Sequence, residues 1–121
     1  PEEILPAVAQ GAIAITCRSG DVRAMEFLAP LNHAPTMARV TAERALLAVL
    51  DGSCRTPIAA LAEITPQGDM SLRALVARPN GTDLMETSRL GPISQAEAMG
   101  DDAGTELRDR AGPGFFDPDP A

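Results

Sequence analysis

This sequence has three side chains that offer thiol or imidazole chemistry: Cys17, His33 and Cys54. The two cysteines lie 37 positions apart and share a single histidine, which matches no recognisable zinc-ligand spacing. No serine nucleophile or carboxylate is arranged around His33 in the sequence, so a catalytic triad is not indicated. We expect His33 to face solvent or to cap the helix that follows it. Cys54 is therefore the main candidate for a chemical role.

Cys54 lies on a short connector between the end of an apolar helix and the start of a strand. Gly52 is predicted to end that helix in a left-handed conformation. The negative end of the helix dipole opposes thiolate formation, whereas the neighbouring Arg55 favours it. This setting fits a thiol that forms one lasting covalent bond, or a plain buried thiol, and the residues alone favour the plain thiol. Cys17 lies in a nearly continuous apolar run and is predicted to be a small core residue.

A helix and three strands surround this connector. The helix covers residues 36–51 and is apolar almost all the way round, which predicts burial on most sides. Arg39 and Glu43 lie four positions apart on it, and such a pair contributes only ~0.2–0.5 kcal/mol. An Asn-Gly pair favours a tight hairpin turn between the last two strands, and the polar third strand is predicted to be an edge. The strands are expected at residues 58–65, 70–78 and 83–90.

A second long helix is predicted from a capping box at Ser94 to about residue 111. Its inner stripe should consist of Ala96, Met99, Ala103 and Leu107. Gly100 and Gly104 are expected to weaken it by ~1 kcal/mol each relative to alanine. The order helix, three antiparallel strands, helix predicts an α+β domain, a small three-stranded antiparallel sheet with helices on one face.

The first part of the chain cannot enclose a core by itself. Residues 12–18 are predicted to be a strand buried on both faces, and a short helix follows the N-cap Asp21. We expect this orphan strand and helix to pack on another domain, and the chain to be a fragment whose beginning has been cut away. The expected division is therefore residues 1–32, a hinge with elements of a missing domain, and residues 33–121, the domain that carries the cysteine. Its tail is predicted to be flexible from about residue 113.

Composition narrows the class of protein. The chain has 121 residues, a net charge of −7 and only 2% aromatic residues, without tryptophan or tyrosine. These values argue against a nucleic-acid partner or an anionic membrane. No apolar run approaches the ~20 residues that span a bilayer, and the N-terminus lacks signal-peptide features, so a cytoplasmic location is expected. The missing Cys-x-x-Cys pair argues against a thiol-redox protein, which leaves a small binding or regulatory module with an incidental buried cysteine as one open interpretation.

Two motifs resemble those of the porphobilinogen deaminase family, also called hydroxymethylbilane synthases. Residues 5–12 read Leu-Pro-Ala-Val-Ala-Gln-Gly-Ala and are similar to the family's Leu-Pro-Ala-Val-Gly-Gln-Gly-Ala segment. Residues 41–44 resemble its Glu-Arg helix, and residues 51–59, which include Cys54, resemble its Glu-Gly-Gly-Cys-x-x-Pro-Ile loop. The separation of the two motifs also fits the family. The resemblance covers essentially the whole chain and weakens after about residue 91.

The resemblance implies that Cys54 holds a dipyrromethane cofactor, two linked pyrroles, through a thioether. Gln10 and Gly11 match the hinge segment that lies against the bound pyrroles and are weaker candidates for cofactor contact. The family joins four porphobilinogen units into hydroxymethylbilane and releases ammonia at each step, in tetrapyrrole biosynthesis. The partners implied are porphobilinogen and the growing pyrrole chain, and the full enzyme is expected to be a monomer.

The resemblance also implies that the catalytic residue lies outside this chain. The family's catalytic aspartate lies in the first of its three domains, so no residue of this chain is assigned a catalytic role, and the fragment alone is expected to be inactive. Two small departures concern backbone geometry. Ala9 stands in place of the first glycine of the hinge motif, and Ser53 in place of a glycine before the cysteine.

Overall fold

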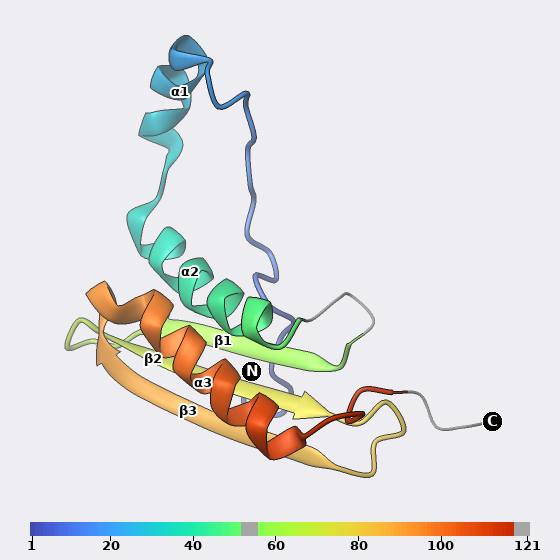
Figure 1. The fold of residues 1–121 in the computed structure, drawn as a ribbon. Helices are drawn as coiled ribbons and strands as arrows, with labels where there is room; N and C mark the ends of the chain where they lie inside the picture. The colour runs from blue at the N-terminus through green and yellow to red at the C-terminus, as the bar shows by residue number, and fades with distance from the viewer. Residues whose placement is uncertain (52–55, 118–121) are drawn as a thin grey trace.

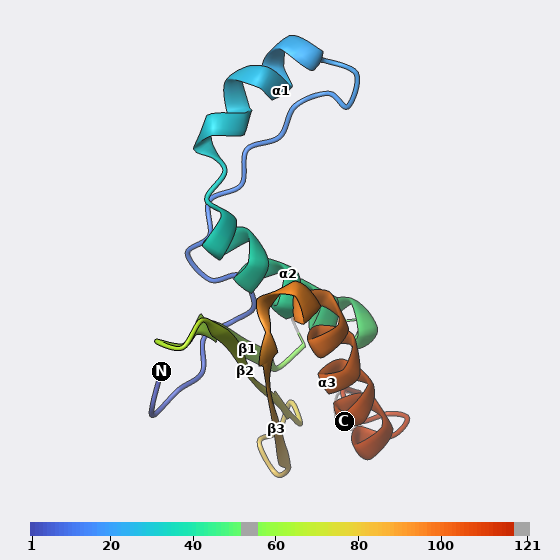
Figure 2. The same ribbon diagram turned by 90° about the vertical axis from the view of Figure 1, so that its left-hand side faces the viewer.

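The computed structural model describes residues 1–51 and 56–117, and Figure 1 shows a sheet covered on one face by two helices. The sheet is antiparallel with the order β1-β2-β3, as the sequence predicted. Its strands are β1 (Ile58–Ile64), β2 (Asp69–Ala77) and β3 (Leu84–Pro92). The covering helices are α2 (Ala34–Val49) and α3 (Ala96–Ala111), which lie on the same side in Figure 2. The predicted α+β class is thus confirmed.

The core lies between the sheet and the two helices. Alternate residues of the strands point inward, which is why the period-two pattern of β2 identifies its buried face. The inward strand residues are Ile58, Ala60, Ala62, Met70, Leu72, Ala74 and Val76. Leu46 of α2 and Leu107 of α3 meet them from above, and Phe115 closes one end of the core at 1% exposure. The expected inner stripe of α3 is buried in full.

Two glycines of α3 allow it to lie unusually close to α2. A Cβ atom on Gly100 would lie 2.7 Å from the Cβ of Ala45, and one on Gly104 would lie 2.9 Å from the Cβ of Val49. Real Cβ atoms do not approach other atoms that closely. The helix-weakening glycines noted in the sequence are therefore the contact surface between the two helices, and their intrinsic cost is offset by packing.

Helix boundaries differ from expectation at two points. α2 ends at Val49, and Asp51 takes a left-handed conformation with φ of 49°; Gly52, the predicted left-handed stop, lies outside the described residues. The capping box was wrong, because Ser94 belongs to the short turn η2 (Ile93–Gln95) and Gln95 precedes α3 without a side-chain cap. The first half of α2 is also exposed, with Met37 at 54%, because these turns extend beyond the sheet.

Residues 12–31 stand away from this core (Figures 1 and 2). They consist of an extended stretch, the helix α1 (Val22–Leu28) and the turn η1 (Ala29–Leu31). The strand predicted at residues 12–18 is not formed, because no strand lies beside this stretch to share hydrogen bonds. Cys17 is exposed, so its predicted place in a core was wrong for this chain. Asp21 caps α1 as expected, accepting a bond from the Ala24 amide at 2.9 Å.

An ion network ties the edge strand β3 to α3. The Glu106 carboxylate accepts bonds from Thr87, Arg89 and Arg110 at 2.7–2.8 Å. Arg89 bonds Asp102 as well, and Arg110 donates to the Glu86 backbone carbonyl at 2.9 Å. Hydrogen bonds from Arg89, Thr87 and Arg110 lower the pKa of Glu106 to about 2. The network therefore favours the ionised form of this carboxyl group.

We predict that Gly100→Ala lowers the free energy of unfolding by ~1–3 kcal/mol, although alanine is the better helix former, because the added methyl group overpacks the contact with α2. Urea unfolding of the 121-residue chain measures the change. Gly20→Ala is the control, since a Cβ there meets no atom within 4 Å. Equal stability of Gly100→Ala and the unmodified chain would contradict the close packing.

Glu106 should make stability depend on pH. Because its pKa is lower in the folded state than the ordinary 4.5, its stabilising contribution is complete above pH 4.5 and is lost as the pH falls towards about 2. We expect the difference in unfolding free energy between the unmodified chain and Glu106→Gln to shrink over that window. Asp101→Asn, which removes an exposed carboxyl group of the same helix, is the control. A difference that stays constant from pH 6 to pH 2 would contradict the assignment.

Candidate functional site

The predicted attachment residue, Cys54, lies outside the described residues, together with its neighbours 52, 53 and 55. The structure does place both ends of this connector. Asp51 follows the last turn of α2, and Thr56 precedes β1. What lies around Asp51 therefore shows which parts of the chain a group on the connector would meet.

A shallow cavity of about 230 Å³ borders the start of the connector. Its lining comes from the hinge and from the last turns of α2: Val8, Ala9, Arg44, Leu47, Ala48 and Asp51. Two segments that are far apart in sequence, both singled out by their motifs, thus meet at one place. Arg44 is exposed there and gives the cavity a permanent positive charge.

The hinge segment is docked on the free edge of β1. The Ala60 amide donates to the Pro6 carbonyl at 3.1 Å, and Ala7 forms an isolated antiparallel bridge with Ala59. Val8 packs against the core. Residues 6–9 therefore lie against the sheet-and-helix body, although they precede β1 by about fifty positions in sequence.

A tight turn follows the docked segment. The Gln10 amide donates to the Ala7 carbonyl, and the Ala12 amide donates to the Ala9 carbonyl, each at 3.1 Å. Ala9 has φ of 56° and Gly11 has φ of 77°, so both are left-handed. Gln10 and Gly11 are exposed, and they follow Ala9, which lines the cavity beside Asp51, without lining it themselves. The structure thus brings the turn close to the connector and leaves the Gln10 side chain open to solvent.

Glu43 has different partners from the one that the sequence predicted. Instead of pairing with Arg39 on the surface, it is buried at 6% exposure and joins two distant backbone segments. Its Oε2 accepts a bond from the Ala9 amide at 2.7 Å, and its Oε1 accepts one from the Ala62 amide at 2.8 Å. A signal was available, because Glu43 shares a helical face with Leu46 and Leu50, which points into the core.

Other candidate residues do not form a site. His33 is exposed, as expected, with Nδ1 2.8 Å from the Thr36 hydroxyl. Among residues 1–51 and 56–117, no three His, Cys, Asp or Glu side chains group as metal ligands would. No helix in this part of the chain is long and apolar enough to cross a bilayer.

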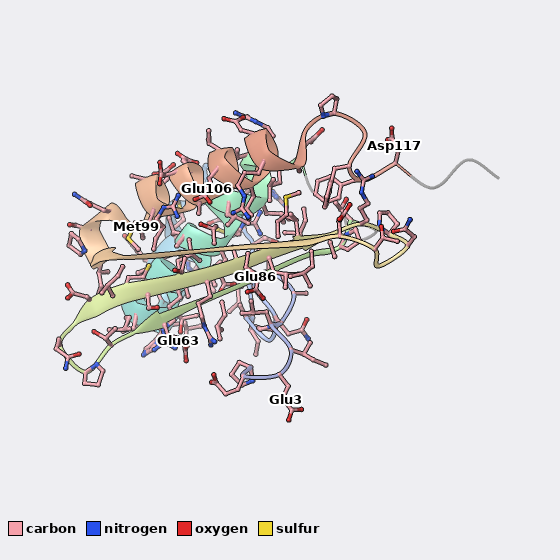
Figure 3. All side chains as sticks on the ribbon, turned by 90° about the horizontal axis from the view of Figure 1, so that it is seen from below. Glu3, Glu63, Glu86, Met99, Glu106 and Asp117 are labelled. Carbon is pink, nitrogen blue, oxygen red and sulfur yellow. The ribbon has the colours of Figure 1, made fainter. Side chains whose placement is uncertain are left out.

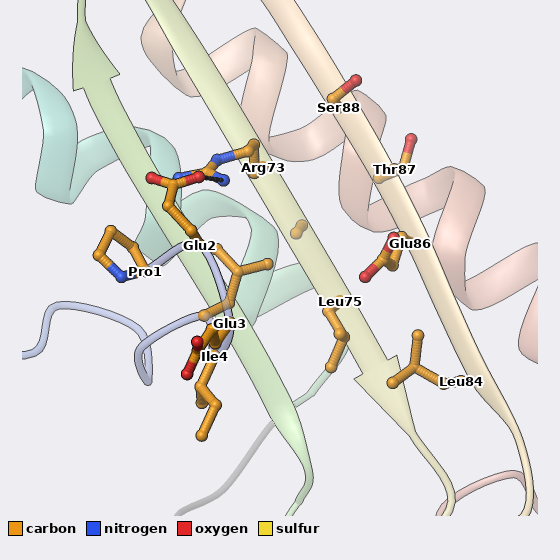
Figure 4. Close-up of a pocket in the computed structure, with 12 residues that line it drawn as sticks. Pro1, Glu2, Glu3, Ile4, Arg73, Leu75, Leu84, Glu86, Thr87 and Ser88 are labelled. Atoms are coloured by element: carbon orange, nitrogen blue, oxygen red, sulfur yellow. Dashed lines mark ion pairs between the residues drawn. The ribbon is translucent and has the colours of Figure 1, made fainter.

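A larger cavity lies on the opposite face of the sheet (Figures 3 and 4). It has a volume of about 660 Å³ and lies between residues 1–5 and strands β2 and β3. Its one cation, Arg73, is already paired with Glu2 at 3.5 Å and with Glu63 at 3.3 Å. The N-terminal residues therefore rest on the uncovered face, away from the helices and from the connector.

Comparison with known proteins identifies the sequence family. The family model described as "Porphobilinogen deaminase, C-terminal domain" matches residues 37–109. The chain is 54% identical over 117 residues to the chloroplastic porphobilinogen deaminase of Pisum sativum, covering 95% of this chain and 32% of that protein. It is 54% identical over 118 residues to the chloroplastic enzyme of Oryza sativa subsp. japonica, with 96% and 33% covered. The porphobilinogen deaminase of Paracoccus denitrificans is 50% identical over 118 residues, with 97% and 37% covered. The chain spans about a third of the length of these curated relatives.

The left-handed Ala9 leads to a prediction. Glycine adopts this conformation without the ~1–2 kcal/mol penalty of an L-residue, and it costs ~0.5–1 kcal/mol in chain entropy. We therefore expect Ala9→Gly to raise the free energy of unfolding of the chain by roughly 0.5–1 kcal/mol in urea melts. Ala7→Gly, in the same segment but without a positive φ, should lower it. A destabilised Ala9→Gly variant would contradict the conformation assigned to the turn.

Proposed function

This chain belongs to the porphobilinogen deaminase family, and on that premise we propose that it is the part of such an enzyme that carries a dipyrromethane cofactor on Cys54. The full-length enzyme is then a transferase that joins four porphobilinogen units into hydroxymethylbilane, with release of ammonia. The observation that carries the proposal is the match of the C-terminal domain model over residues 37–109, a range that contains the cysteine loop.

The cavity beside the connector is lined by one basic side chain, Arg44, and one acidic side chain, Asp51, and Arg44 could pair with carboxylate groups on the proposed cofactor. The hinge turn and the start of the loop border one cavity, so a group attached at Cys54 has two backbone segments within reach. Arg44 provides that cavity with a guanidinium group, which binds carboxylates in planar, charge-assisted pairs. When bound, the cofactor supplies the pyrrole to which the first substrate unit is joined.

Each residue of this chain then has a limited task. Cys54 holds the cofactor by a thioether, which remains intact while the pyrrole chain grows. Gln10 and Gly11 would contact the pyrroles from the hinge turn, where the side-chain amide group of the exposed Gln10 can donate or accept hydrogen bonds. We assign no catalytic acid or base to this chain, and we propose that the carboxylate that acts on the reacting pyrroles belongs to another part of the enzyme. The chain alone is therefore expected to show no turnover.

The domain organisation follows from the same proposal. Residues 33–121 form the cofactor-attachment domain, and residues 1–32 contain the hinge with a segment that returns to another domain. The exposed apolar side chains of that segment support this division, because Ile13 at 94%, Phe27 at 70% and Leu31 at 65% have no core of their own. Within residues 1–32, residues 6–9 lie against the edge of the sheet, where the Ala9 amide donates a hydrogen bond to Glu43.

Further properties of the whole enzyme stay predictions. We expect a monomer that binds porphobilinogen and the growing pyrrole chain and binds neither nucleic acid nor membranes, in line with the net charge of −7. The names of the two plant relatives place those proteins in chloroplasts. For the present protein the expected compartment is the cytoplasm.

The attachment at Cys54 is tested by mass spectrometry of the full-length protein made in its own host. We expect one adduct of two linked pyrroles on the peptide that contains Cys54, and a positive colour reaction for pyrroles. Cys54→Ser should lose both the adduct and turnover, whereas Cys17→Ser should retain both. An active enzyme with an unmodified Cys54 would exclude the attachment proposal. A full-length protein that shows neither turnover nor pyrroles would favour the alternative, a small binding module with an incidental cysteine.

A further inference from the structure

We propose that Glu43 is a positioning residue, which fixes the hinge turn at residues 8–11 relative to the end of α2 at Asp51, after which the chain continues to Cys54; this inference rests on the proposed function. The side chain comes from the middle of α2 and is 6% exposed. It binds the hinge through Ala9 and the sheet through Ala62, so one side chain joins three segments of the chain.

Only a carboxylate of this length satisfies both partners. Each oxygen of Glu43 accepts a hydrogen bond from a backbone N–H, at 2.7 Å from Ala9 and 2.8 Å from Ala62. A glutamine in the same place would present an NH₂ donor to one of these two N–H groups and would lose that bond. Two backbone N–H donors on different segments thus explain why an acidic side chain is buried here. The carboxylate is needed to accept these two bonds.

The bond to Ala62 continues the pairing on the free edge of β1. The Ala60 amide donates to Pro6, and the next outward-facing amide, that of Ala62, donates to Glu43. The hinge backbone therefore covers one part of the edge and the glutamate covers the part beyond it. The Ala60 and Ala62 amides are thus both satisfied, which covers this part of the β1 edge against other strands.

The bond to Ala9 sets the position of the turn. Ala9 is held at a positive φ, and its amide would lose its partner if the turn moved away from α2. Ala9 also lines the cavity next to Asp51, where the connector begins. The neighbouring Arg44 lines the same cavity, whereas Glu43 does not. Glu43 thereby fixes the hinge turn relative to the end of α2 without facing the cavity itself.

Hydrogen exchange of the 121-residue chain tests the clamp directly. In Glu43→Gln we expect the Ala9 or Ala62 amide to exchange at least about tenfold faster, because one of them loses its acceptor. Core amides such as Leu72 and Leu107 should exchange at the same rate as in the unmodified chain. Glu63→Gln, a surface change on β1, is the matched control and should leave both amides protected. Unchanged exchange at Ala9 and Ala62, or equal acceleration throughout the core, would overturn the inference.

Kinetics of the full-length holoenzyme test the functional part. For Glu43→Gln we expect kcat per mole of Cys54-bound cofactor to fall about tenfold, with KM for porphobilinogen within about twofold, because a displaced hinge turn misaligns groups without removing a substrate contact. Glu63→Gln should match the unmodified enzyme. A purely structural role would lower the amount of holoenzyme while leaving kcat per mole of cofactor unchanged, and that result would overturn the inference.

A second variant keeps the test decisive if Glu43→Gln fails to fold. Glu43→Asp retains two acceptor oxygens but is one methylene shorter, so it reaches only one of the two amides well; its kcat per mole of cofactor should fall by an intermediate factor. A wild-type value in this variant would overturn the inference. An unmodified enzyme without pyrroles on Cys54 would instead contradict the proposed function, and hydrogen exchange would still decide whether Glu43 clamps the hinge.

Discussion

The arrangement of this chain depends on one buried side chain, Glu43, which accepts hydrogen bonds from Ala9 and Ala62. These amides lie 34 and 19 positions away from it, so the two bonds close large loops and hold the N-terminal hinge against the domain core. A hydrogen bond to a carboxylate is stronger than one between neutral groups, and leaving a buried amide unpaired is costly. Hinge, α2 and β1 therefore behave as one body at this point.

The rest of the body is held by burial and close packing. The sheet offers one alternating apolar face that the helices cover, and among the described residues the aromatic side chains at this core are Phe115 and Phe116, which follow α3. Small residues contribute to the close packing, because Gly100 and Gly104 let α3 approach α2 to backbone contact. A close helix pair fixes the end of α2, and the cysteine connector starts there. The position of the candidate site thus depends on a packing feature on the far side of α2.

Sequence patterns predicted the elements well and their partners poorly. The alternation of β2 gave its buried face, and the order of elements gave the antiparallel sheet, because both follow from local periodicity. Glu43 was interpreted as a surface residue because a nearby Arg39 offered a local partner, whereas its true partners are backbone amides brought together only by folding. Gly100 and Gly104 were expected only to weaken α3, because their contact with α2 is likewise formed only by folding. The motif around Cys54 pointed to the family through resemblance, while the thiol chemistry alone favoured a plain buried cysteine.

The chain is bonded to the domain core on one side of the hinge turn and is exposed on the other side. This contrast explains why one side chain, Glu43, can fix the position of the turn. On one side, residues 6–9 are bonded to β1 and Glu43 and move with the body. On the other side, residues 12–18 share no strand pairing with the described chain and expose Ile13 and Ile15. The outer segment, residues 12–31, is joined to the body at two places, between Gln10 and Ala12 and between η1 and α2. At the first of them Gly11 has the conformational freedom of a left-handed glycine. A fixed Ala9 next to a permissive Gly11 thus places one of the two connections at the residues proposed to contact the cofactor.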